Sequence, residues 1–435
     1  MNCPICKQNN WENVDRFRIK PVGMHLCHGC GFVSYPERYK NKQEVLEYYR
    51  GNQYRTAPTC NNLFTGHKKL NYHSIFLKET IEGWIDEKKN NPVIVDVGAA
   101  MGLFAAWWKN LRAENGEILF PNADINGVEL TRSFRRVAWH EYGINLTESF
   151  DESKKYDLIT SYKVLEHIFD PDQELDMYAR SLSKNGLLYI SVPVWYEKMH
   201  NFGVGGWDIE YYYHPDHVNV WSKAHFEYLL AKSGFEIIKQ DHALYDSTYL
   251  CKVSDKNRPE KVNVSFQDIG PKLALIFAAD EVLRAKNFDQ AIELWPRFPV
   301  ARRARYEYSR TKAHENGFEW IKEHHIDSWL SIDPDCWEAY SFATDIAARY
   351  DQFDLALKYI SKALELQPNS DAHLSVLLNI YKAMANKADN QKNKMEFLGN
   401  AINVARKLRV ISPQNLAQVT TSLYNDYASI PMPGE

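Results

Sequence analysis

The stretch that decides the fold reads Val93-Ile-Val-Asp-Val-Gly-Ala-Ala-Met-Gly-Leu-Phe104. The β-branched residues at its start predict a buried strand, and the glycines at 98 and 102 predict a tight turn. The segment from Leu103 to Arg112 then has the apolar spacing of a helix. A strand that passes through a glycine turn into a helix is typical of the first unit of a parallel α/β sheet.

Working outward, the sequence from Pro92 to about Val253 alternates short β-branched runs with longer amphipathic stretches. This alternation predicts an α/β, doubly wound, mostly parallel, Rossmann-like core of seven strands. We expect glycines 143 and 234 to end helices, and Asn185-Gly186 to make a turn. The expected strands are Val93–Val97, Ile125–Leu130, Ile144–Thr147, Tyr156–Ser161, Leu187–Pro193, Phe235–Gln240 and Thr248–Val253.

Four of the seven cysteines lie in the first 30 residues, where twenty residues separate the pair Cys3 and Cys6 from the pair Cys27 and Cys30. In a reducing compartment this C-x2-C pairing predicts a tetrahedral Zn²⁺ site. Four thiolates leave no open position on the ion, so we expect a structural zinc ribbon over residues 1–36. His28 is an alternative ligand that the two complete cysteine pairs make unnecessary.

Beyond Lys261 the sequence predicts helices only. The segment Asp335–Pro368 resembles a tetratricopeptide repeat, whose period is about 34 residues. Stacked repeats present a concave face, so we expect this all-α domain, residues 262–435, to bind a protein partner or a second copy of the chain. An irregular helical bundle is the alternative interpretation.

The repeat prediction specifies where the helices begin and end. An inserted loop is expected at Asn386–Lys394. Helices are expected to open at Phe288, Phe318, Phe353 and Phe397 and to close on Pro299, Pro334, Pro368 and Pro413, which are 35, 34 and 45 residues apart.

Length and charge bound the remaining possibilities. A chain of 435 residues predicts two or three domains, and a net charge of -4 argues against a dedicated nucleic-acid binder. The chain lacks a leader-like start and a run of 18 apolar residues, so we expect a cytoplasmic protein without membrane insertion. The predicted divisions are 1–36, a helical linker or cap at 37–80, the core at 81–255 and the repeats at 262–435.

The turn at 96–102 resembles the cofactor-binding turn of class I S-adenosylmethionine-dependent methyltransferases. Asp96, Gly98 and Gly102 match the family's acidic residue and alternate glycines, whereas Ala100 stands where the middle glycine is expected. The resemblance implies that these four residues bind S-adenosylmethionine. An acidic Asp96 suits hydrogen bonding in a site for this cationic cofactor.

Two further stretches carry the same resemblance. Glu129 ends the second strand, where an acidic residue accepts hydrogen bonds from ribose hydroxyls; a solvated strand-end glutamate is the alternative. The segment Tyr156–Pro171 resembles the family's fourth-strand motif, with a V-L-E-H turn and an acidic-Pro helix start. By this resemblance Tyr162, Glu166 and His167 line the cofactor or acceptor cleft, although His167 has a packing role as its alternative.

An aromatic and histidine-rich loop, Trp207–Ser222, is expected after the fifth strand and suits an acceptor pocket. The pKa of histidine fits a general base, so His214, His217 and His167 are the candidate catalytic residues, with Tyr211–Tyr213 shaping the pocket. A structural role for the histidines is an alternative. A metal cluster is another, and it would use Asp208, His214, Asp216 and His217.

The order of ribbon, tyrosine-rich segment Leu46–Tyr49 and core resembles methyltransferases of sugar and surface-glycan biosynthesis, including sugar C-methyltransferases with an N-terminal zinc domain. The resemblance implies methyl transfer to a small molecule or glycan precursor, such as a nucleotide-linked sugar or a saccharide. Three alternatives remain: a macromolecular acceptor recruited by the ribbon and repeats, a non-catalytic scaffold with a degenerate fold, and a nicotinamide enzyme.

Overall fold

The computed structural model describes residues 2–13, 25–35, 41–50, 91–111, 117–195, 217–241, 246–254, 258–296, 298–368 and 370–411. The described residues up to Phe277 belong to one compact unit, and those from Ala278 onward belong to another. None of the helices in these ranges is long and apolar enough to cross a membrane.

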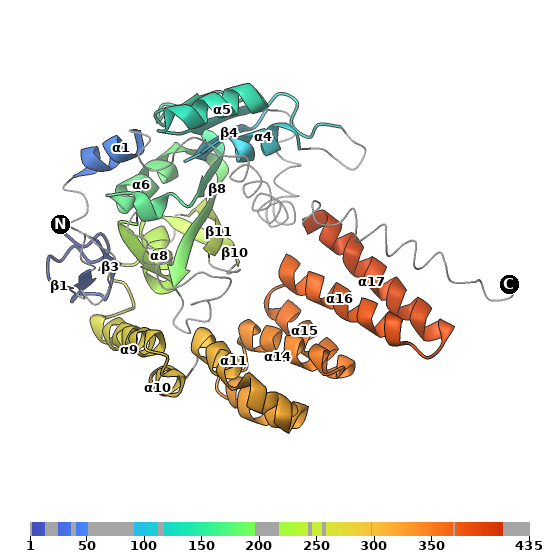
Figure 1. Ribbon diagram of the computed structural model, residues 1–435. Helices are drawn as coiled ribbons and strands as arrows, with labels where there is room; N and C mark the ends of the chain where they lie inside the picture. The colour runs from blue at the N-terminus through green and yellow to red at the C-terminus, as the bar shows by residue number, and fades with distance from the viewer. Residues whose placement is uncertain are drawn as a thin grey trace. The chain divides into compact units, whose positions relative to one another are not determined.

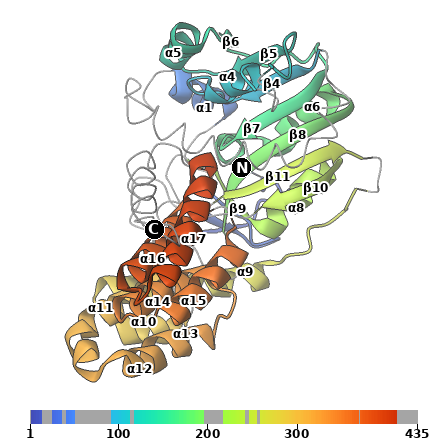
Figure 2. The ribbon, with the colours of Figure 1, turned by 90° about the vertical axis from the view of Figure 1, so that its right-hand side faces the viewer.

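One twisted sheet forms the centre of the first unit (Figures 1 and 2). Five strands run parallel in the order β6, β5, β4, β7 and β8, while β11 is antiparallel to β8 and β10 to β11. The sheet strands are β1 (Trp11–Asn13), β2 (His25–Cys27), β3 (Val33–Ser34), β4 (Val93–Val97), β5 (Asp124–Val128), β6 (Leu146–Thr147), β7 (Tyr156–Tyr162), β8 (Leu182–Trp195), β9 (Asn219–Ser222), β10 (Phe235–Asp241) and β11 (Asp246–Val253).

Helices cover both faces of the sheet, which confirms the expected Rossmann-like α/β core with a mostly parallel sheet. Alternate residues of a strand point to opposite faces. Val95 packs in a cluster with Leu175 and Phe226, whereas its neighbour Ile94 packs with Trp108. These side chains come from α6 (Pro171–Ser181), α8 (Lys223–Lys232) and α4 (Leu103–Lys109). The unit also contains α1 (Lys42–Arg50), α5 (Arg132–Tyr142), the 3₁₀ turn η1 (Leu165–His167) and the first part of α9 (Phe266–Arg284).

Each of the seven predicted strand stretches contains a strand, but the Asn185-Gly186 prediction was wrong. The strand β8 begins at Leu182, so Asn185 lies inside it with a left-handed φ of 64°. The pairing passes from Tyr156 with Leu182 to Leu158 with Leu187. The residues between Leu182 and Leu187 form an irregularity in the pairing with β7, and β8 continues beyond it.

The N-terminal strands belong to the same sheet, which therefore has eleven strands among the described residues instead of the seven expected. The strand β3 pairs with β9, and β9 pairs with β8 at Val194 and Trp195, beyond the residues of β8 that pair with β11. We expected residues 219–222 to be loop. They form a strand because the ribbon supplies a partner on one side and the end of β8 supplies one on the other.

The second unit is helical, as expected. Within it, Leu374 and Leu378 of α16 pack against Leu398 and Ala401 of α17, so these two helices lie side by side (Figure 2). The helices from residue 266 onward are α9 (Phe266–Arg284), α10 (Phe288–Leu294), α11 (Pro299–Asn316), α12 (Phe318–Ile321), η3 (Lys322–Asp327), α13 (Ser328–Leu330), α14 (Trp337–Arg349), α15 (Phe353–Leu366), α16 (Asp371–Lys387) and α17 (Gln391–Ile411).

Two boundary predictions in this unit were wrong. Pro299 does not close a helix but begins α11, because a proline needs no hydrogen-bond partner at the first helical position. Phe397 lies inside α17, and the expected loop at Asn386–Lys394 is shortened to residues 388–390, between α16 and α17. The Asn390 side chain accepts from the Asn393 amide at 2.9 Å and so caps the longer helix. Pro413 lies outside the described residues, and the tetratricopeptide assignment stays a prediction.

Candidate functional site

The turn between β4 and α4 has a left-handed backbone at three positions. The φ angles are 70° at Gly98, 47° at Ala100 and 76° at Gly102. A Cβ on Gly98 would lie 2.3 Å from the Val164 side chain, so glycine is needed there for space as well as for φ. Ala100 adopts a conformation that costs an L-residue about 1–2 kcal/mol. Ala100, which stands where the family pattern has a glycine, is therefore a strained residue.

Glu129 follows β5 directly and holds this turn. One of its carboxylate oxygens accepts from the Ala100 amide at 2.9 Å, and the other accepts from the Thr131 amide at 2.7 Å. Thr131 precedes the first residue of α5. The side chain of Glu129 thus connects the glycine turn to the start of the next helix and is fixed beside both.

Asp96 is buried within β4, with only 4% of its surface exposed. Its carboxylate accepts from the Thr160 hydroxyl of β7 at 2.7 Å. Burial, together with a smaller contribution from the charge of Glu129, raises the pKa of Asp96 to about 7 against the opposing effect of the Thr160 hydrogen bond. Asp96 therefore changes charge near neutral pH, underneath the glycine turn.

The V-L-E-H motif forms the turn after β7. Lys163 has a left-handed φ of 55°, and its amide donates to Ser191 of β8 at 2.8 Å. The turn continues into η1, where Glu166 is buried and its Oε1 lies 3.8 Å from Nε2 of His167. As expected, Asp170 and Pro171 then start α6.

Backbone contacts bring His217 to His167. The Val218 amide donates to the Glu166 carbonyl at 2.8 Å, and the Asn219 side chain donates to the Ile168 carbonyl at 2.7 Å. The imidazoles of His167 and His217 meet edge to face, with their centroids 5.0 Å apart. The structure thus places two of the three predicted catalytic histidines together. The remaining predicted residues of this stretch lie outside the described residues: Asp208, Tyr211–Tyr213, His214 and Asp216.

The helix α1 reaches the same region of the first unit. Its Tyr49 carbonyl accepts from the Thr131 hydroxyl at 3.2 Å, and the Tyr49 ring packs edge to face on His167. These contacts link the segments that follow β5 and β7. The tyrosine-rich stretch therefore has a defined place beside the predicted site.

We call the side of the sheet where β4, β5 and β7 end the carboxyl edge. The chain order reverses here, since β5 and β6 lie on one side of β4 while β7 and β8 lie on the other. In open α/β sheets, ligands bind outside the carboxyl ends of the strands at this reversal. Gly98 and Glu129 follow β4 and β5, and Tyr162 ends β7, so predicted cofactor residues meet at this edge.

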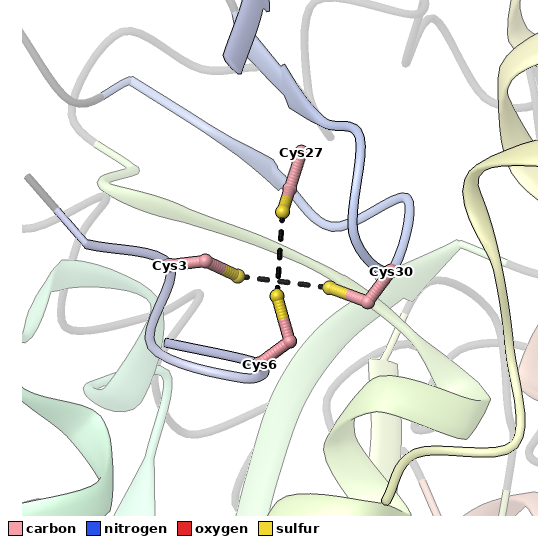
Figure 3. A group of neighbouring side chains, drawn as sticks. All are labelled: Cys3, Cys6, Cys27 and Cys30. Carbon is pink, nitrogen blue, oxygen red and sulfur yellow. Dashed lines mark hydrogen bonds between the residues drawn. The ribbon is translucent and has the colours of Figure 1, made fainter. Parts of the chain in front are cut away.

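The four N-terminal cysteines form a separate cluster, with their sulfur atoms directed toward one centre (Figure 3). The Sγ atoms of Cys3 and Cys30 are 3.6 Å apart, and those of Cys6 and Cys27 are 3.5 Å apart. Hydrogen bonds with Cys3 and Cys30 lower the pKa of the Cys27 thiol, and the same hydrogen bonds to Cys27 raise the pKa values of Cys3 and Cys30. The arrangement is suited to a metal ion.

The two cysteine knuckles have the same backbone construction. The Lys7 amide donates to the Cys3 carbonyl at 2.9 Å, and the Gly31 amide donates to the Cys27 carbonyl at 2.7 Å. Lys7 and Gly31 both have left-handed φ angles, 62° and 73°. His28, the alternative ligand, stacks on Phe266 and lies 3.3 Å from the carboxylate of Glu12.

The sequence analysis missed His225, which joins the ribbon to the core. Its Nδ1 is 2.7 Å from the Ser222 hydroxyl, and its Nε2 is 2.8 Å from the Cys30 carbonyl. Burial lowers the pKa of His225 to about 4, against the hydrogen bond to Cys30, so the ring is neutral at physiological pH. The Ser222-x-x-His225 spacing signals the start of α8, but no local pattern signals the contact with Cys30.

The comparisons with known proteins agree with this fold. Residues 75–240 match the family model described as a methyltransferase domain. The search of curated proteins finds no match. Part of this chain is therefore similar to a methyltransferase domain.

Solved structures similar to the chain include methyltransferases. Magnesium protoporphyrin IX methyltransferase from Synechocystis, with bound SAH, has 15% identity and a TM-score of 0.34 over 49% of this chain and all of its own. DesVI from Streptomyces venezuelae has 11% identity and a TM-score of 0.34, over 44% and 94%. A chain of the complex between the Haloferax volcanii Trm112 activator and a methyltransferase has 13% identity and a TM-score of 0.30, over 43% and 97%.

Proposed function

We propose that this protein transfers a methyl group from S-adenosylmethionine to a small molecule or a glycan precursor, such as a nucleotide-linked sugar or a saccharide. One observation carries the proposal: the Glu129 carboxylate is fixed by backbone amides beside the glycine turn, at the carboxyl edge. An acidic residue at the tip of the second strand is suited to ribose hydroxyls. The match of residues 75–240 to a methyltransferase domain supports it.

The predicted cofactor residues then have separate tasks. Gly98, Ala100 and Gly102 let the backbone approach the cofactor closely, and Glu129 accepts hydrogen bonds from its ribose. Asp96 supports the turn from below through Thr160. When bound, S-adenosylmethionine supplies a methyl group on a sulfonium, which an acceptor attacks in line.

Tyr162, Glu166 and the paired histidines lie toward the acceptor. His167 and His217 face each other at the carboxyl edge, so either imidazole is placed to take a proton from an acceptor held there. Glu166 lies beside His167, with its Oε1 3.8 Å from Nε2 of the ring. We keep His214 as a third candidate base from the sequence.

We also propose that the four cysteines hold a structural Zn²⁺. In a tetrahedral site with Zn–S bonds of about 2.3 Å, sulfur atoms lie about 3.8 Å apart. The observed separations of 3.5 and 3.6 Å are close to this value. Zinc bound here would stabilise β3, and through β3 it would hold β9, the strand that follows His217.

The helical unit is proposed to bind a protein partner or a second copy of this chain. Its support is the stacking of consecutive helices: α14 and α15 share one apolar cluster, and α16 and α17 share another. Such stacks expose an extended face when they repeat.

The first test is calorimetric titration of the zinc-loaded full chain with S-adenosylmethionine and with S-adenosylhomocysteine. We expect both to bind. Sugar nucleotides and saccharides would then be screened for release of S-adenosylhomocysteine. Failure of the folded protein to bind either compound would overturn the proposal and favour a non-catalytic scaffold.

A further inference from the structure

We propose that Glu166, His167 and His217 form a second metal site, for a divalent first-row transition ion, at the carboxyl edge. We call these three residues the histidine cluster. Each offers one ligand atom, and the three atoms lie within 4.8 Å of one another. Two imidazoles and one carboxylate form a donor set that binds Mn²⁺, Fe²⁺ or Zn²⁺ and leaves positions open for other ligands.

The fold holds the three residues from two directions. His167 is next to Glu166 in η1, and His217 arrives on the segment that leads into β9. Backbone and side-chain hydrogen bonds join these segments on both sides of the cluster, at Glu166 with Val218 and at Ile168 with Asn219. The ligands are therefore positioned by the main chain, as a binding site requires.

Burial adds a second argument. Glu166 is 1% exposed and His217 is 8% exposed. A carboxylate removed from water is costly unless a cation or hydrogen bonds compensate it. A divalent ion between the carboxylate and the two imidazoles would stabilise the charge of Glu166 at this buried position.

The distances indicate how far the cluster must close. With metal bonds of about 2.1 Å, neighbouring ligands of a tetrahedral ion lie about 3.4 Å apart. Oε1 of Glu166 and Nε2 of His167 are already at 3.8 Å. No pair of ligand atoms is more than 4.8 Å apart. The backbone of both segments is held by hydrogen bonds, so we expect the side chains alone to move when the cluster closes around an ion.

This inference rests on the proposed function. If the protein transfers a methyl group, a metal ion at the histidine cluster restricts the class of acceptor. Three protein ligands leave room on the ion for an oxygen of the acceptor, whereas the four cysteines leave none. A bound ion would act on such an oxygen as a Lewis acid and would lower the pKa of a hydroxyl. We therefore expect an acceptor that presents a hydroxyl or carbonyl oxygen next to its methylation site. With His167 and His217 bound to the ion, His214 would be the remaining candidate base.

The test measures metal binding by the full chain with its ribbon loaded with zinc. Mn²⁺ is titrated, and the loss of the free-ion signal is followed by electron paramagnetic resonance. We expect one Mn²⁺ per chain, with affinity lowered at least about tenfold in Glu166→Gln and His217→Gln. His140→Gln is the matched control, since His140 is an exposed histidine on α5, and it should bind Mn²⁺ as the wild type does.

A second measurement keeps the test decisive if a variant unfolds. The zinc-loaded wild-type chain should bind one equivalent of added Co²⁺. The bound Co²⁺ should show no thiolate charge-transfer band, because the histidine cluster contains no sulfur. Wild-type protein that takes up no Mn²⁺ or Co²⁺ beyond the ribbon would overturn the inference. So would folded Glu166→Gln and His217→Gln variants with unchanged affinity.

Cofactor titration of the same samples separates this inference from the proposed function. Binding of S-adenosylmethionine without a second metal would reject the histidine cluster as a metal site and leave methyl transfer standing. Binding of a second metal without binding of S-adenosylmethionine would reject methyl transfer and support the histidine cluster as a metal site.

Discussion

The cysteine ribbon and the glycine turn are held together by different means. In the ribbon, each knuckle closes on itself through a bond between residues four apart, as from Gly31 to Cys27. In the glycine turn, Ala100 depends on Glu129 and Asp96 depends on Thr160, which are 29 and 64 residues away. Each cysteine knuckle is thus a local construction, whereas the glycine turn exists only within an assembled sheet.

The largest effect in this comparison should come from Cys27→Ser. Structural zinc contributes about 10–16 kcal/mol to small metal-dependent folds, so we expect loss of the bound zinc and unfolding of the ribbon. Hydrogen exchange should also rise at Val220 and Trp221 of β9. Zinc content and exchange rates measure both effects. His28→Gln is the control, and zinc retained by Cys27→Ser would contradict a four-cysteine site.

The next effect concerns Asp96 and pH. Its pKa of about 7 in the folded state lies above the ordinary 3.8, so the folded protein binds a proton that the unfolded chain releases. The free energy of unfolding should therefore decrease as the pH rises from about 4 to about 7, by a total on the order of 4 kcal/mol.

Urea unfolding of the wild type and of Asp96→Asn across this range tests the prediction. The difference between the two proteins should change with pH, because the amide does not titrate. Glu141→Gln, on the exposed side of α5, serves as the control. A constant difference from pH 4 to pH 8 would show that Asp96 does not retain its proton.

A smaller effect is expected at the proposed cofactor site. Glu129→Ala removes the proposed acceptor for the ribose and should weaken S-adenosylmethionine binding at least about tenfold, or about 1.4 kcal/mol. Calorimetric titration measures it. Glu141→Ala should bind as the wild type does, and equal affinity in Glu129→Ala would assign that residue to the turn alone.

The smallest effect should be a gain. Glycine at position 100 relieves a left-handed φ that costs about 1–2 kcal/mol but adds about 0.4–1 kcal/mol of freedom to the unfolded chain. Ala100→Gly should therefore raise the free energy of unfolding by about 0.5 kcal/mol. Ala106→Gly, inside α4, should lower it by about 1 kcal/mol. Thermal melts of both variants check the opposite signs.

Local signals in the sequence predicted much of this architecture. The glycines at 98 and 102 marked the turn, and the V-L-E-H and Asp170-Pro171 motifs marked the segment after β7. Prediction failed where a local signal was overruled or missing. Asn185-Gly186 reads as a turn, but pairing with β7 continues past it. The polar start of α17 carries no apolar period, so it resembled a loop.

The sequence by itself determined the pairs of cysteines, the strand and turn at 93–102 and the alternation of strands with helices. These features depend on spacing and backbone preference over a few residues. Only the tertiary structure decided that the ribbon extends the sheet through β9, that His225 reaches Cys30, and that His217 lies against Glu166 and His167. Those contacts join residues about fifty to two hundred positions apart, so no local pattern predicts them. They accompany the pairing of β9 with the end of β8.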